Sequence, residues 1–287
     1  MSNNPLRVAA IHDLSGFGRC SLSVILPVLS SMGVQAVAVP TAVLSSHTGG
    51  LGDVVFRDLT DYISPCLAHY KKIGVDFDCV YSGFLGSQEQ IDHCLEFFRS
   101  YPGALAVVDP VMGDHGKAYR TCTADIRRRM AELISIADII TPNLTEGYIL
   151  LNQDYSDQCL SRTDARKMLV KLSEKGPKYV VVTGVPMMTG EMANIGYDRS
   201  KNAFWIVKCN YVPVSYPGTG DIYASVLTGS MLCGDSLPIA MERATHFVEA
   251  AIKITFSYAT DTRYGVMLEK VLPMLSVRET LTGYEVL

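Results

Sequence analysis

Short apolar segments alternate with longer segments of helical periodicity along most of this 287-residue chain. The apolar segments are rich in valine, isoleucine and alanine, as is typical of strands covered on both faces of a sheet. Strands that alternate with helices usually pair in parallel, so the pattern predicts an α/β fold of three layers, with helices on both faces of a mostly parallel central sheet. The predicted strands are residues 7–11, 35–39, 79–81, 104–108, 138–140 and 178–182.

Helix boundaries can be predicted between and after these strands. Ser87-Gln88-Glu89-Gln90 is typical of a capping box, in which the first and last residues bind each other's backbone N–H groups. It precedes apolar residues spaced three and four apart, which form one stripe of a helix. Two further helices are predicted near the carboxyl end of the chain, at about residues 220–233 and 238–258.

One segment departs from the parallel pattern. Residues 192–197 and 203–208 flank a polar turn at residues 198–201, which predicts an antiparallel hairpin at the sheet edge. The sequence contains no recognisable linker, low-complexity tract or internal repeat. We therefore expect one domain over residues 1–287.

Charge and cysteine spacing narrow the class of protein. The chain has 25 Lys and Arg against 29 Asp and Glu, a net charge of −4, and no long basic run offsets it. We expect neither a nucleic-acid nor a membrane partner, because both attract basic surfaces. The eight cysteines include no CxxC pair, and residues 1–5 lack the features of a secretory signal. We therefore expect the thiols to be reduced and the protein to be cytoplasmic.

The loops after the predicted strands are where function is expected, because open parallel sheets bind ligands at the carboxyl ends of their strands. Polar residues and glycines concentrate there. The loops are residues 13–18, 41–50, 82–86, 109–116, 141–146, 183–184 and 217–221.

The most informative of these loops is Pro217-Gly218-Thr219-Gly220-Asp221, directly ahead of a helix. Glycines at a helix amino terminus expose backbone N–H groups at the positive end of the helix dipole, which suits a phosphate or a developing oxyanion. Capping of the helix by Thr or Asp at a glycine turn explains the same residues equally well, so both readings stay open. The segment is neither a P-loop nor a dinucleotide-binding fingerprint.

Carboxylates follow two other predicted strands. Asp109 ends one strand and Asp114 lies five residues on, a pattern that can supply oxygen ligands to Mg²⁺ or can form a solvated Asp-Pro turn. Glu146 follows another strand, either as a second acidic contact or as a favourable charge in a first helical turn. Together with the glycine-rich helix terminus, these groups suit Mg²⁺-assisted phosphoryl transfer.

The motifs also resemble a known family. Gly218-Thr219-Gly220-Asp221 is similar to the anion-hole motif of ribokinase-like kinases. Three further segments narrow the resemblance to pyridoxal kinases, in the same order along the chain from about residue 7 to residue 254. They are Asp109-Pro110-Val111-Met112-Gly113, Thr141-Pro142-Asn143-Leu144 with Glu146, and Ser45-Ser46-His47-Thr48-Gly49.

The resemblance implies a ribokinase-like fold and an enzyme that phosphorylates the 5′-hydroxymethyl group of pyridoxal, pyridoxine or pyridoxamine with ATP. Asp221 would accept the proton of this hydroxyl, and the N–H groups of Gly218, Thr219 and Gly220 would stabilise the transferring phosphoryl group. Asp109, Asp114 and Glu146 would surround Mg²⁺ and a monovalent cation such as K⁺. The remaining implied ATP contacts are Asn143, Thr183 and Tyr119, the last in a segment similar to the family's active-site flap.

The implied substrate site combines Thr48, His47, Phe84 and Asp13 with Asp221. Two positions depart from the family. Asp13-Leu14 replaces the usual Ser-His, where a carboxylate could bind the ring hydroxyl or a protonated ring nitrogen, and Phe84 lacks a hydroxyl. His12 and His47 are interpreted either as ligand contacts or as hydrogen-bonded loop histidines.

Three alternatives accompany this reading. A hydroxymethylpyrimidine kinase or a sugar kinase would share the fold, although relatives that use a Cys nucleophile carry it where this chain has Asp221. A catalytically silent, ligand-binding descendant is the third possibility. The resemblance also implies a homodimer.

Overall fold

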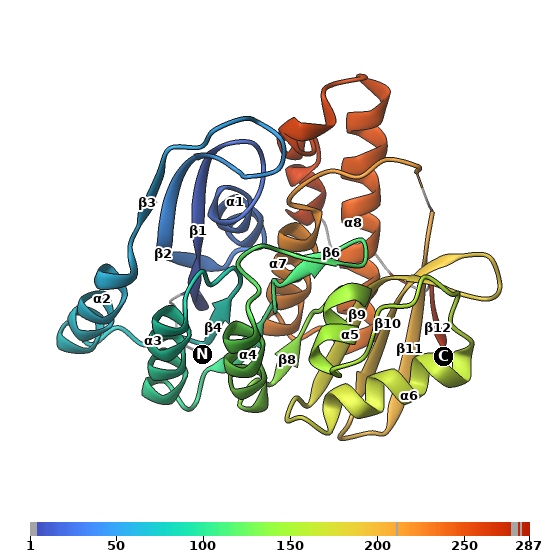
Figure 1. Cartoon of the computed structure of the whole chain (residues 1–287), viewed down its shortest axis with the longest axis horizontal. Helices are drawn as coiled ribbons and strands as arrows, with labels where there is room; N and C mark the ends of the chain where they lie inside the picture. Colours follow the sequence, from blue (N-terminus) through green and yellow to red (C-terminus); the bar gives the residue numbers. More distant parts are fainter. Residues whose placement is uncertain (1–4, 211, 277–280, 282) are drawn as a thin grey trace.

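A ten-stranded sheet runs through the centre of the molecule (Figure 1). The computed structural model describes residues 5–210, 212–276, 281 and 283–287. The central strands pair in parallel, whereas the pairs at both ends of the sheet are antiparallel. In spatial order the strands are β12 (Tyr284–Val286), β11 (Ala203–Cys209), β10 (Met192–Asp198), β9 (Tyr179–Pro186), β8 (Ile139–Ile140), β5 (Leu105–Val108), β4 (Cys79–Ser82), β1 (Arg7–Phe17), β2 (Gln35–Ser46) and β3 (Phe56–Asp58).

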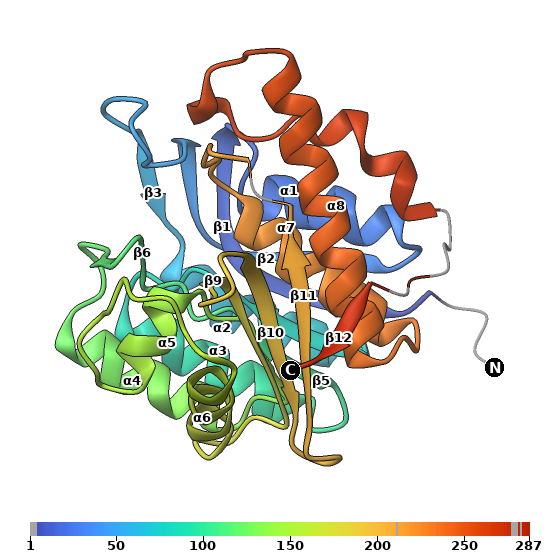
Figure 2. The same ribbon diagram turned by 90° about the vertical axis from the view of Figure 1, so that its right-hand side faces the viewer.

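Helices cover both faces of this sheet, and Figure 2 shows the two helical layers on opposite sides. One layer holds α1 (Leu22–Ser31), α7 (Thr219–Leu232) and α8 (Leu237–Ser257). The other holds α2 (Thr60–Lys72), α3 (Gln88–Ser100), α4 (Ala124–Ser135), α5 (Leu144–Leu150) and α6 (Arg162–Ser173). Short 3-10 helices at Thr262–Tyr264, Leu268–Lys270 and Leu272–Ser276 follow α8. The predicted three-layer fold is thus confirmed.

The apolar runs of the sequence are explained by burial on both sides of β1. Val8 and Ala10 pack in the core beneath α1 and α7, whereas Ala9 and Ile11 pack in the core beneath α2 and α3. Successive side chains of a strand point to opposite faces, so a strand with helices on both faces must be apolar at every position.

The predicted strands are confirmed, but two of them are much longer than expected. β1 and β2 run on together to Phe17 and Ser46, with a register shift between His12 and Leu14. The predicted loops 13–18 and 41–50 are therefore largely strand. Their polar residues suggested loops, yet here they line the site end of the sheet, where an apolar run is not required.

The predicted capping box at Ser87 forms only by half. The Gln90 backbone N–H donates to the Ser87 hydroxyl at 3.2 Å. The Gln90 side chain, however, accepts from the Gly86 N–H at 2.8 Å and donates to the Thr41 carbonyl at 3.1 Å. The Gln90 side chain is buried, and a buried amide must satisfy both its oxygen and its nitrogen. Its bonds to Gly86 and Thr41 therefore replace the expected bond to the Ser87 N–H.

The predicted hairpin is confirmed as β10 and β11, with the short β12 added beyond it. A small antiparallel pair that the sequence did not predict, β6 (Gly113–Asp114) and β7 (Lys117–Ala118), stands apart from the main sheet. In the described part of the chain, no helix combines the length and apolar character needed to cross a membrane. The expectation about a secretory signal concerns residues 1–5, of which residues 1–4 lie outside the described residues.

Candidate active site

Asp221 lies in the first turn of α7, where the chain leaves a glycine turn. Gly218 is the N-cap residue with φ +81°, and a Cβ atom there would lie 2.0 Å from the Arg19 carbonyl oxygen. Only glycine satisfies both the left-handed backbone and the close approach. At Gly220, by contrast, a Cβ atom would meet no other atom within 4 Å. The helix terminus therefore faces open space on the side of Gly220, where its free N–H groups could receive an anion.

Both carboxylate oxygens of Asp221 have partners within the protein. The Ser21 backbone N–H donates to Oδ2 at 2.6 Å, and Nε2 of His12 lies 3.2 Å from Oδ1. Ser21 has φ +56°, a backbone conformation that is strained for a residue with a side chain. The contact of Ser21 could not be predicted from the sequence, because the backbone N–H of Ser21 makes it.

Asp13 is buried and bound on both oxygens. Oδ1 accepts from the Ser21 hydroxyl at 2.7 Å and lies 2.8 Å from Nδ1 of His12, while Oδ2 accepts from the Ser15 hydroxyl at 2.9 Å. Burial opposes ionisation of Asp13, but the hydrogen bond and charge of His12 and the two hydroxyls lower its pKa below the ordinary value. Asp13 is thus engaged by neighbouring side chains and not aimed freely at a ligand.

His12 stands between the two carboxylates and is 3% exposed. Burial alone would lower the pKa of its imidazole, but the charges and hydrogen bonds of Asp221 and Asp13 raise it to about 10. The two carboxylates therefore favour the protonated form of the imidazole. Of the two sequence interpretations for His12, the structure favours the hydrogen-bonded one, with Asp13 as the hydrogen-bond partner and the proposed base Asp221 as an ion-pair partner.

Asp109 and Glu146 are two buried acids at the carboxyl ends of β5 and β8. Burial and the charge of Asp221 raise the pKa of Asp109 to about 7. Burial and the charge of Asp109 raise the pKa of Glu146 well above its ordinary value. Burial and neighbouring negative charges destabilise each carboxylate, so the pair fits a cation.

Glu146 also has a structural role that the sequence left as an alternative. It forms a capping box with Asn143 at the start of α5, and its Oε1 accepts from the Met112 N–H at 3.0 Å. The Asn143 side chain donates in turn to the Gly113 carbonyl at 2.8 Å. These contacts join the loop after β5 to the start of α5 and use the polar atoms of Asn143.

Asp114 and Tyr119 lie on or beside the β6–β7 pair. The Asp114 side chain is 47% exposed and accepts from the His115 N–H at 2.8 Å. Partial burial and the charge of Asp114 raise the pKa of Tyr119, and the charges of Glu146 and Asp221 raise it further. Tyr119 therefore lies within electrostatic reach of the proposed site.

No three His, Cys, Asp or Glu side chains form a ready metal site among the residues that the structure describes. Asp109, Asp114 and Glu146 thus do not make a self-sufficient metal cage. Mg²⁺ does not need one in phosphoryl transfer, because it usually takes one or two carboxylates, waters and phosphate oxygens. The buried acids of Asp109 and Glu146 fit such a partial site.

The predicted substrate residues lie in different surroundings. Thr48 is exposed and Phe84 is half-buried. Nε2 of His47 donates to the Arg263 carbonyl at 2.6 Å, and its Nδ1 accepts from the Gly49 N–H at 3.0 Å. Both ring nitrogens are used, so His47 ties the loop after β2 to the segment after α8. Thr183, half-buried in β9, forms a parallel bridge with Asn143.

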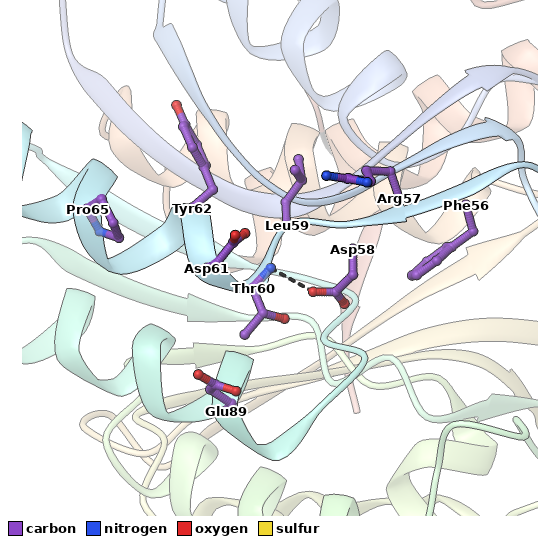
Figure 3. Close-up of a pocket in the computed structure, with 9 residues that line it drawn as sticks. All are labelled: Phe56, Arg57, Asp58, Leu59, Thr60, Asp61, Tyr62, Pro65 and Glu89. Atoms are coloured by element: carbon purple, nitrogen blue, oxygen red, sulfur yellow. Dashed lines mark hydrogen bonds between the residues drawn. The ribbon is translucent and has the colours of Figure 1, made fainter.

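A wide surface hollow of about 870 Å³ lies apart from these residues, beside β3 and the start of α2 (Figure 3). Three of its nine lining residues are acidic and one is basic, an excess of negative charge that does not suit a nucleotide triphosphate. Within it the Thr60 N–H donates to the Asp58 carboxylate at 2.8 Å. Its lining residues are Phe56, Arg57, Asp58, Leu59, Thr60, Asp61, Tyr62, Pro65 and Glu89.

Comparison with known proteins identifies the family of this chain. The family model described as phosphomethylpyrimidine kinase matches residues 26–265. A relative from Arabidopsis thaliana, the chloroplastic thiamine biosynthetic bifunctional enzyme TH1, is 30% identical over 79% of this chain. The alignment spans 42% of that longer relative.

Two solved structures share the whole fold. A candidate phosphomethylpyrimidine kinase from Bacteroides thetaiotaomicron, crystallised with pyridoxal, is 43% identical with a TM-score of 0.94, over 99% of this chain and 100% of that one. Pyridoxal kinase from Lactobacillus plantarum is 31% identical with a TM-score of 0.86, over 96% and 97% of the two chains.

Proposed function

The chain belongs to the phosphomethylpyrimidine kinase family, and we propose that it transfers a phosphoryl group from ATP to the 5′-hydroxymethyl group of pyridoxal, pyridoxine or pyridoxamine. Its relatives are named for kinases of vitamin B6 and of the thiamine pyrimidine, so it is a vitamin kinase of this family. The observation that carries the choice of vitamin B6 is the similarity, at 43% identity, to a structure that contains pyridoxal.

Asp221 is the proposed base. In the proposed reaction the substrate hydroxyl oxygen forms a bond to the γ-phosphorus, the bond from that phosphorus to the ADP oxygen breaks, and the hydroxyl proton passes to Asp221. The N–H groups of Gly218, Thr219 and Gly220 would face the charge on the transferring group from the end of α7. Positioned donors at a helix terminus stabilise such charge without reorganising.

The buried acids are proposed to hold the cation that accompanies ATP. Asp109 and Glu146 would bind Mg²⁺ directly or through water, with Asp114 nearby at the edge. When bound, Mg²⁺ neutralises phosphate charge, and K⁺ would serve as a second, monovalent cation. The proposed ATP contacts at the same end of the sheet are Asn143, Thr183 and Tyr119.

The vitamin itself is proposed to lie between Phe84, which can stack on a pyridine ring, and Thr48. His47 would contribute by holding the loop of Thr48 in place. Asp13 would not touch the vitamin directly but would hold the His12 imidazole. A hydroxymethylpyrimidine presents a similar flat ring with one hydroxymethyl group, so it is the second candidate substrate, and thiamine-related relatives favour keeping it in the test.

A substrate panel tests the proposal. Purified protein with ATP and Mg²⁺, with and without K⁺, is given pyridoxal, pyridoxine, pyridoxamine, hydroxymethylpyrimidine and ribose, and ADP release and the phosphorylated product are measured. We expect the highest kcat/KM with a vitamin B6 compound. A higher value with hydroxymethylpyrimidine would replace the proposed substrate, and no transfer to any alcohol would indicate a catalytically silent descendant.

We also propose that the protein is a cytoplasmic homodimer folded as one domain per chain. Sedimentation equilibrium tests the dimer, with an expected mass of twice the 31.4 kDa of one chain. A mass of 31.4 kDa at micromolar concentration would show a monomer.

A further inference from the structure

The imidazole of His12 lies beside the proposed base, and His12 belongs to none of the motifs that carry the family resemblance. Nε2 of His12 lies 3.2 Å from Oδ1 of Asp221, and Nδ1 lies 2.8 Å from Oδ1 of Asp13. His12 is 3% exposed and Asp13 is 6% exposed. A buried imidazole between two carboxylates is a costly arrangement unless each group compensates the others.

The surrounding backbone is shaped to keep this imidazole in place. A Cβ atom at Gly83 would lie 1.9 Å from Cδ2 and 2.3 Å from Nε2 of His12, so only glycine leaves room for the ring. Ser21 connects the two carboxylates from the other side, since its N–H donates to Asp221 and its hydroxyl donates to Asp13. The four residues His12, Asp13, Ser21 and Asp221 therefore form a closed ring of hydrogen bonds and ion pairs, here called the His12 ring.

We propose that His12 is a positioning residue for the base Asp221, and that Asp13 orients the His12 imidazole; this role rests on the proposed kinase function. The Asp221 carboxylate is held at both oxygens, by the hydrogen bond from the Ser21 N–H to Oδ2 and by the ion pair of His12 with Oδ1. Each carboxylate oxygen has two lone pairs, so Asp221 retains acceptor capacity for the substrate hydroxyl. The hydroxyl proton passes to Asp221, and the imidazole keeps both of its protons throughout.

The imidazolium also offsets an electrostatic problem of the site. Asp221 and Asp109 repel each other, and both face the negative phosphates of ATP. The groups whose charges act on His12 are Asp221 and Asp13, and the charge of His12 in turn acts on Asp109. A fixed cation in this cluster offsets the negative charge that gathers around Asp221.

Kinetics of His12→Gln, Asp13→Asn and the double variant test the role. We expect His12→Gln to lower kcat about 10- to 100-fold, a fraction of what a full general base contributes, with KM for ATP and for the vitamin changed less than about threefold. Asp13→Asn should lower kcat less, and the double variant should be no slower than His12→Gln, because Asp13 acts through His12. The control is His93→Gln, which removes an imidazole 3.7 Å from Glu89 on α3 and should leave kcat unchanged.

A second measurement does not depend on turnover. In the wild-type protein labelled with ¹⁵N-histidine, we expect the imidazole of His12 to carry protons on both nitrogens at pH 7.5. Asp221→Asn should shift the Nε2 resonance, and Asp13→Asn the Nδ1 resonance. This measurement also keeps the proposal testable if His12→Gln fails to fold, with His12→Asn as the second kinetic variant.

The outcomes separate the two levels of the proposal. A folded His12→Gln enzyme with kcat within twofold of wild type, or a singly protonated His12, would overturn the positioning role while leaving the kinase function in place. Intact His12 resonances without transfer to any alcohol would instead overturn the kinase function, and the positioning role with it.

Discussion

At the residue scale, Asp109 illustrates a conflict between function and stability. Its carboxyl is buried, its pKa is raised to about 7, and the nearby charge of Asp221 contributes to the shift. A carboxyl whose pKa is higher in the folded than in the unfolded protein costs free energy of folding that grows as the pH rises above its unfolded pKa and is complete above its folded pKa. The site therefore holds a group that is poorly accommodated until a cation is present.

Replacing Asp109 with Asn should stabilise the protein at pH 8 in a chelating buffer. The gain is expected to be on the order of 2 kcal/mol and to diminish as the pH falls from 7 towards 4, because near pH 4 the carboxyl is protonated in the unfolded protein as well as in the folded one. Urea unfolding at several pH values measures it. Asp114→Asn is the control, since this half-exposed carboxylate should change stability by less than about 0.5 kcal/mol. A less stable Asp109→Asn protein at pH 8 would contradict the prediction.

Asp221→Asn should abolish most turnover while preserving nucleotide binding. The amide oxygen can still accept from the Ser21 N–H, so the fold of the loop is retained, but an amide cannot take the substrate proton. We expect kcat to fall at least about 100-fold, with the affinity for ATP, measured by calorimetry, changed little. Asp235→Asn, at the other end of α7 and paired with Arg243, is the matched control. Near-full activity of Asp221→Asn would exclude it as the base.

The sequence could predict some of these residues and not others, for physical reasons. The position of Asp221 in a first helical turn could be predicted because glycines precede it, whereas its role as the base was implied by the family resemblance. Ser21 was missed because it acts through its backbone N–H, which every residue except proline has. The bond between His12 and Asp221 joins positions 209 residues apart, and only the folding of β1 beside α7 brings them together.

At the scale of elements, the amino end of α7 shows how adjacent glycines can have different requirements. Gly218 is fixed by its positive φ and by the close Arg19 carbonyl oxygen. Gly220 has helical geometry and no neighbouring atom where a Cβ would lie. The first glycine is needed for the fold of the turn, and the second leaves space in front of the helix terminus.

The pair Gly218→Ala and Gly220→Ala should therefore change stability in opposite directions. Gly218→Ala is expected to cost about 1–3 kcal/mol, whereas Gly220→Ala should stabilise by up to about 1 kcal/mol because alanine favours the helix. Gly220→Ala should nevertheless raise KM for ATP, since its methyl group would enter the space proposed for the phosphoryl group. Thermal unfolding and kinetics measure both effects. Equal changes in stability for the two variants, or an unchanged KM for ATP in Gly220→Ala, would contradict the different requirements of the two glycines.

The ends of β1 and β2 were beyond prediction for a related reason. An apolar run marks the part of a strand with cores on both faces, and this part ends near Ile11 and Val39. Beyond it β1 continues through mostly polar residues and β2 through a mixed segment, because each strand pairs with the other, and β3 adds a further partner at Phe56–Asp58. Such pairing depends on distant segments, so local composition indicated loops.

At the scale of the whole molecule, the connection through β8 raises the question of cooperativity. β8 has two residues, Ile139–Ile140, and it joins β1–β5 to β9–β12 within the sheet. The helical layers, however, cross this narrow point. α7 and α8 follow β11 in the chain, yet Val8 of β1 and Val207 of β11 belong to the same hydrophobic core beneath them. A core shared by both ends of the chain favours unfolding as a unit.

We therefore expect a single cooperative transition in urea. Trp205, the one tryptophan of the sequence, lies in β11, so its fluorescence reports on the β9–β12 end of the sheet alone. Far-UV circular dichroism reports on helices of both layers. Coincident midpoints by the two probes would support the one-domain proposal, because neither half could lose its helices while the other keeps its packing. A fluorescence midpoint clearly apart from the dichroism midpoint would show two units separated at β8.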